Sequence, residues 1–150
     1  MISKKNEILQ YLKSIYIKIC NKIGYMILIK DQRKSIHSDK LKKYYTNTGT
    51  YFLPEYAYQD VVRNEIIKNR IFDEEIFNIG KNFIKEESIV IDAGANFGQM
   101  SILFSRVKKN VEVHSFEASP FIYEILKKNV QINNLNIKTF NFILSDKSEN

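Results

Sequence analysis

Short strands alternate with helices from residue 88 onward, and this alternation limits the fold more than any other feature of the chain. The run "SIVIDA", residues 88–93, is rich in β-branched residues and apolar on both faces, as a strand inside a parallel sheet requires. Four later elements are predicted from their apolar periods: a helix over 99–108, a strand over 111–117, a helix from Pro120 to "NNLN" at 133–136, and a strand over 137–144. The order β-α-β-α-β predicts an α/β fold with a parallel, Rossmann-like sheet.

The predicted elements also carry local signals. Ser119 suits a helix N-cap and Pro120 the first helical position. Asn129 and Asn133 fall late in the same helix and are expected to cap or end it. On the helix over 99–108, one stripe carries the apolar residues Met100, Leu103, Phe104 and Val107.

The residues before 88 are predicted to form helices and a polar connection. Apolar residues at helical spacing make 6–19 an amphipathic helix, which packs on its own domain or makes weak contact with a membrane surface. Residues 31–50, with "YYTNTGTYF" at their end, are predicted to be a loop or a short hairpin, and two helices follow. We divide the chain into a basic helical and loop segment, lead-in helices and a cofactor domain, over 1–50, 51–87 and 88–150.

The net charge of +6 is unevenly distributed. Residues 1–50 carry 11 Lys or Arg against 3 Asp or Glu, a net +8, whereas residues 51–150 carry 12 against 14, a net −2. The basic character therefore belongs to the N-terminal segment, which keeps a nucleic-acid partner as an alternative. The lysines lack the interleaved aromatic pattern typical of a strand-binding groove, so a nucleic-acid partner is not the first expectation.

Other compositional features exclude whole classes of protein. The single cysteine, Cys20, cannot form an internal disulfide, and His37 and His114 lack ligand-spaced partners, so no metal site is predicted. The longest apolar stretch, "IGYMILI", is far shorter than the roughly 20 residues of a membrane span. No signal peptide pattern is present, and the expected location is cytoplasmic.

The turn after the first strand, D-x-G-A-N-x-G, distinguishes between nucleotide ligands. A phosphate-binding P-loop needs four residues between its glycines and a following lysine, whereas three separate Gly94 from Gly98. The dinucleotide fingerprint needs a middle glycine where Asn96 stands, which argues against an NAD-binding domain. Asp92 suits an ammonium, and Glu117, 19 residues after Gly98, falls where an acid binds ribose hydroxyls. S-adenosylmethionine has these groups and no phosphate.

The motifs "VIDAGANFGQMS", "VHSFEASP", "LKKNVQINNL" and "LSDKS", in this order, resemble the FkbM-type methyltransferases of the class I S-adenosylmethionine-dependent enzymes. The resemblance covers about residues 86–150. It implies that the methionine end of the cofactor lies against Asp92, Gly94, Ala95, Asn96 and Gly98. It further implies contacts to the ribose and adenine from Glu117, Ala118, Ser145 and Asp146. The alternatives are that Asp92 caps the turn, that Glu117 is a solvated strand end, and that Ser145 and Asp146 form an ordinary turn.

The family's next element, a fourth strand ending in a "KxDxEG"-like motif, has no match here. Of the family's sheet order 3-2-1-4-5-7-6, the chain is expected to supply 3-2-1, without the C-terminal strands. Residues 88–93 would then be an edge strand and a site for oligomerisation. We therefore expect a truncated methyltransferase, inactive alone, with no catalytic base to name. Its acceptor would be a small molecule or glycan, methylated on oxygen. The alternatives are a nucleic-acid methyltransferase and a non-catalytic cofactor-binding or interaction fragment.

Overall fold

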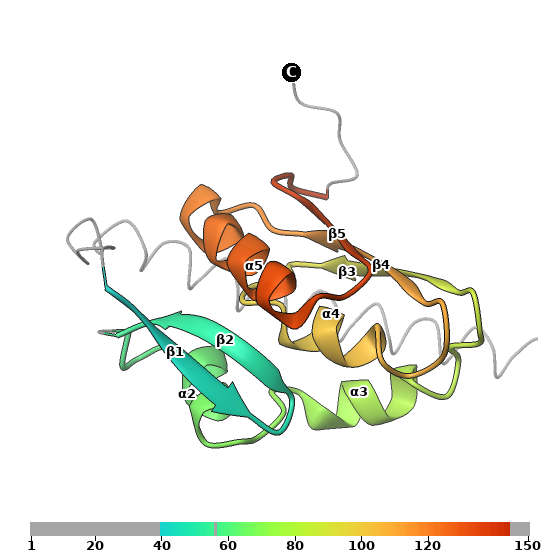
Figure 1. Ribbon diagram of the computed structural model, residues 1–150, viewed down its shortest axis with the longest axis horizontal. Coiled ribbons are helices and arrows are strands. Elements are labelled where there is room, and N and C mark those ends of the chain that lie inside the picture. Colours follow the sequence, from blue (N-terminus) through green and yellow to red (C-terminus); the bar gives the residue numbers. More distant parts are fainter. Residues whose placement is uncertain (1–39, 56, 145–150) are drawn as a thin grey trace, which may run out of the picture. The chain divides into compact units, whose positions relative to one another are not determined.

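The predicted strands form one parallel sheet in the order β3-β4-β5 (Figure 1). The computed structural model describes residues 40–55 and 57–144, which all lie within the compact unit Ser38–Asn150. The sheet consists of β3 (Ile89–Ala93), β4 (Glu112–Phe116) and β5 (Ile137–Phe140). The predictions for residues 6–19, Cys20, His37, Ser145 and Asp146 lie outside the described residues.

The strand register places the carboxyl ends of β3 and β4 next to each other. Asp92 pairs with Ser115 and Ala93 with Phe116. Val113 and Ser115 of β4 are fully buried, as their alternation predicts. Within the described residues β3 is an edge strand, as expected, and its Ile89 and Ile91 are 66% and 65% exposed.

The two predicted crossover helices are α4 (Gln99–Phe104) and α5 (Pro120–Asn133). The expected start of α5 is confirmed, because the Ser119 side chain accepts a hydrogen bond from the Ile122 N–H and Pro120 opens the helix. The residues of the predicted apolar stripe of α4 are only half-buried. The buried residues of the helix are instead Gln99, Ser101 and Ile102. Helical periodicity misses the two polar ones because each is buried by specific hydrogen bonds, Ser101 to the sheet and Gln99 to the segment around Phe72.

Residues 41–54 form an antiparallel hairpin of β1 (Leu41–Thr46) and β2 (Gly49–Pro54), which decides between the loop and hairpin alternatives. Tyr51 and Leu53 of β2 are fully buried in one cluster with Phe97, Ile102 and Ile125. The hairpin therefore contributes to the same core as the glycine turn and helices α4 and α5.

The two lead-in helices are present as α2 (Val61–Ile67) and α3 (Glu74–Gly80). Asp73 is the N-cap residue of α3, although its side chain makes no capping hydrogen bond. No residue of α3 is buried, and Ile76 and Ile79 are mostly exposed. No helix among the described residues has the length and hydropathy needed to span a membrane.

Two expectations for the C-terminal part are wrong. Asn129 does not cap or end α5; its side chain binds β2 and the glycine turn, and that of Asn133, the last residue of α5, binds β2. The third strand ends at Phe140 rather than at 144, because its partner strand β4 ends at Phe116, the residue that pairs with Phe140; beyond it, the Asn141 side chain donates to the carbonyls of Glu117 and Ala118.

Candidate functional site

The glycine turn, residues 94–98, is held on the end of β4 by its backbone. The N–H groups of Gly94 and Ala95 both donate to the carbonyl of Phe116, each at 2.9 Å. Gly94, Asn96 and Gly98 have φ angles of 81°, 51° and 88°, in the left-handed region that glycine and asparagine tolerate best. The residue types of the motif therefore match the backbone that the turn requires.

The two glycines of the turn have different surroundings. A Cβ atom added to Gly94 would meet no atom within 4 Å, whereas one added to Gly98 would lie 2.7 Å from Cδ1 of Leu126. Leu126 is fully buried in α5. Gly98 thus allows close packing of the turn on α5, and Gly94 leaves open space beside the backbone that a ligand can occupy.

Glu117 joins the glycine turn to the start of α5. One carboxylate oxygen accepts from the Asn96 N–H at 3.0 Å and the other from the Ser119 N–H at 2.8 Å. The side chain is half-buried, so it is not a freely solvated strand end. Since each carboxylate oxygen has a second lone pair, Glu117 can still accept hydrogen bonds from ligand hydroxyls.

Asp92 lies at the end of β3 under the turn. Burial is the largest influence on its carboxyl group and raises its pKa, and the negative charge of Glu117 raises the pKa further. Hydrogen bonds from the side chain and backbone of Ser101 oppose this rise. Ser101 is in turn 2.7 Å from the hydroxyl of Ser115 on β4. The side chain of Asp92 is thus held in place by a chain of hydrogen-bonding partners on α4 and β4.

Asn96 of the glycine turn carries a buried acceptor atom. Its backbone N–H is bound to Glu117, but its side-chain Oδ1 is buried without a hydrogen-bond partner among the described residues. A buried polar atom in this state is uncommon in native proteins, and functional sites are one place where it occurs.

The predicted site residues fall into three groups. Asp92, Gly94, Asn96 and Glu117 meet at the carboxyl ends of β3 and β4. Gly98 and Ala95 belong to the same turn but pack toward α5, where Ala95 is buried with Leu126 and Val130. Ala118 follows Glu117 and is exposed.

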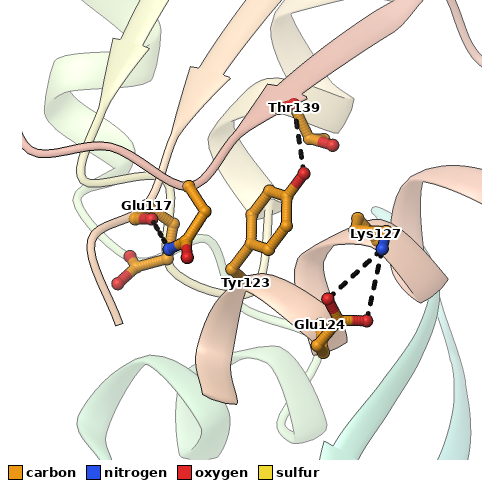
Figure 2. Close-up of polar contacts among 6 residues, drawn as sticks. Glu117, Tyr123, Glu124, Lys127 and Thr139 are labelled. Atoms are coloured by element: carbon orange, nitrogen blue, oxygen red, sulfur yellow. Dashed lines mark hydrogen bonds and ion pairs between the residues drawn. The ribbon is translucent and has the colours of Figure 1, made fainter. Parts of the chain in front are cut away.

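Sequence reasoning missed Asn141, whose amide donates to the carbonyls of Glu117 and Ala118 at 2.8 and 3.2 Å. Its only signal is a polar residue between the phenylalanines of "TFNFIL". Nearby, the Tyr123 hydroxyl donates to the carbonyl of Thr139 at 3.3 Å and ties α5 to β5 (Figure 2).

Comparisons with known proteins bear on this arrangement. No family model matches the sequence. The methyltransferase sdnD of Sordaria araneosa is 26% identical over 72 residues, which are 48% of this chain and 27% of the relative. The chain thus spans about a quarter of the length of the curated relative that it matches.

Two solved structures are similar to part of this chain. P. horikoshii TYW2 in complex with MeSAdo superposes with a TM-score of 0.50 at 17% identity, over 70% of this chain and 37% of that one. The tRNA (uracil-54, C5)-methyltransferase of Pyrococcus abyssi, in complex with S-adenosyl-L-homocysteine, has a TM-score of 0.47 at 17% identity, over 72% and 24% of the two chains. The described residues have a Rossmann-like α/β fold, of which β3, β4 and β5 form a parallel half-sheet, and the predicted fold class is confirmed.

Proposed function

We propose that this chain carries the S-adenosylmethionine-binding half of a methyltransferase. One observation carries the proposal: the open space at Gly94 lies in a turn flanked by two carboxylates, Asp92 and Glu117, at the carboxyl ends of adjacent parallel strands. Ligands of doubly wound sheets bind at this end of the strands.

The charge of the site favours a cation over a phosphate. Burial is the main cause of the raised pKa of Asp92, and the nearby carboxylate of Glu117 raises it further by repulsion. A ligand ammonium would relieve this repulsion, whereas a diphosphate would add to it. S-adenosylmethionine combines an ammonium with a ribose and no phosphate.

The residues take separate roles in this proposal. Asp92 binds the ammonium, Gly94 leaves room for the methionine end, and Glu117 accepts hydrogen bonds from the ribose. Contacts to the adenine from Ala118, Ser145 and Asp146 stay a prediction. The bound cofactor supplies an electrophilic methyl group, and such transfer depends mainly on alignment with the acceptor. The FkbM resemblance makes a hydroxyl of a small molecule or sugar our proposed acceptor.

Calorimetric titration of the 150-residue chain with S-adenosylmethionine tests the proposal. Glu117→Gln removes the charge and one acceptor oxygen, and we expect affinity at least about tenfold weaker. Glu124→Gln is the matched control, since Glu124 lies on the exposed side of α5 and pairs with Lys127 (Figure 2). NAD serves as the diphosphate ligand and should not bind. A folded chain that binds NAD, or that ignores S-adenosylmethionine, contradicts the proposal.

A second candidate is methylation of a nucleic acid, and the net charge of +8 over residues 1–50 favours it. The lysines of this segment would neutralise phosphates, so binding to RNA would weaken steeply as salt rises. RNA binding without this salt dependence, or no binding at all, would leave the small-molecule acceptor as the proposal.

A further inference from the structure

The side chain of Asn129 joins the hairpin to the glycine turn. Asn129 is 0% exposed in the C-terminal half of α5. Its Oδ1 accepts from the Phe52 N–H of β2 at 2.6 Å, and its Nδ2 donates to the Phe97 carbonyl at 2.9 Å. Phe97 lies between Asn96 and Gly98, two of the three residues of the turn that adopt positive φ angles.

Asn133, one helical turn later, makes the comparable contact with β2 and also bonds to Arg106 and to the Asn129 carbonyl, but among the described residues it makes no hydrogen bond to the glycine turn. Its Oδ1 accepts from the Thr50 N–H at 3.0 Å and its Nδ2 donates to the Thr50 carbonyl at 2.7 Å. The two asparagines together satisfy backbone groups along an edge of β2. Asn129 differs in that its amide nitrogen, Nδ2, donates to the glycine turn instead of to the strand.

We infer that Asn129 is a positioning residue for the cofactor site, a role that rests on the proposed function. The hydrogen bond to the Phe97 carbonyl restrains the backbone of the turn at Phe97. It thereby keeps the N–H of the preceding residue, Asn96, directed at Glu117. Without that bond the turn has more conformations in the free protein. Binding must then order the turn, which lowers affinity even when the fold is intact.

The matched variants Asn129→Ala and Asn133→Ala separate positioning from stability. Each removes one hydrogen-bonding amide between α5 and β2, so both should lower the denaturation midpoint. We expect Asn129→Ala to weaken S-adenosylmethionine binding about tenfold at a temperature where circular dichroism shows it folded. Asn133→Ala should stay within about twofold of the wild type, because Asn133 makes no bond to the turn.

Hydrogen exchange of the unmodified chain provides a second measurement, which tests the positioning role of Asn129 even if Asn129→Ala does not fold. Adding S-adenosylmethionine should protect the Phe52 amide, bound to Asn129, more than the Thr50 amide, bound to Asn133. Equal protection of the two amides, or equal affinity of the two alanine variants, overturns the positioning role while the proposed function stands. A wild-type chain that does not bind the cofactor refutes the proposed function itself, and the positioning role with it.

Discussion

Alanine substitutions at Gly94 and Gly98 should have opposite main effects, although both glycines occupy the same backbone region. Their φ angles are 81° and 88°, so either alanine costs about 1–2 kcal/mol of strain. The Cβ at Gly94 meets nothing, and this strain is the whole expected loss of folding stability. The Cβ at Gly98 would lie 2.7 Å from Cδ1 of Leu126, a fully buried side chain that would have to shift against its neighbours in the core.

Overpacking of this kind adds about 1–3 kcal/mol, so Gly98→Ala should lose about 2–5 kcal/mol in total. Gly94→Ala should instead act on binding, because its methyl group fills the space that we assign to the ligand. A misplaced methyl group in a close-fitting pocket is worth about 10–200-fold in affinity. Urea denaturation measures the first effect and calorimetry with S-adenosylmethionine the second, with the wild-type chain as reference.

We therefore expect Gly98→Ala to lose mainly folding stability and Gly94→Ala to lose mainly affinity for the cofactor. Gly94→Ala that binds the cofactor like the wild type would refute Gly94 as the ligand-facing glycine. Equal stability losses in the two variants would show that Leu126 accommodates the added methyl group, and would refute the packing role of Gly98.

Three further predictions concern titration and association. Because the pKa of Asp92 is raised in the folded state, its contribution to folding stability is present below its unfolded pKa and is lost as the pH rises through its folded pKa. Urea unfolding should show this fall in stability, and Asp92→Asn should abolish it. Burial raises the pKa of Tyr51 to about 12, so folding stability should fall between about pH 10 and 12, and it should fall less in Tyr51→Phe. At neutral pH the same substitution should cost about 1 kcal/mol of stability, because the hydrogen bond to Thr48 is lost. Ile91→Lys, on the exposed edge strand, should reduce self-association in sedimentation, and an unchanged sedimentation profile would exclude this edge as the contact.

The strands and helices after residue 88 could be predicted because local patterns determine them. The β-branched run of β3, the alternation of β4 and the Ser-Pro start of α5 each reflect a local preference, and all three agree with the fold. The turn after the first strand could be predicted from its glycines, and its left-handed residues are the glycine and asparagine types that adopt this conformation most readily.

The interactions that hold the site could not be predicted, because they join residues distant in sequence. Asn129 binds Phe52 and Phe97, and no local period shows which strand a helical asparagine will meet. The amide of Gln99 likewise accepts from the Phe72 N–H and donates to the Arg70 carbonyl. Sequence patterns predict that a polar residue of a helix faces solvent, unless the buried partner of its side chain is known.

The same contacts show that the glycine turn depends on residues well before the strand that leads into it. Phe97 of the turn is buried with Tyr51 and Leu53 of the hairpin, and Asn129 bonds to both segments. Removing the hairpin would expose this part of the core and leave Asn129 without its bond to Phe52, while β3 and β4 kept their pairing. Large apolar side chains in such a core each contribute about 1.5–3 kcal/mol of burial, a sizeable fraction of a typical domain's stability. The hairpin is therefore a structural part of the candidate site, although none of its residues lies in the turn.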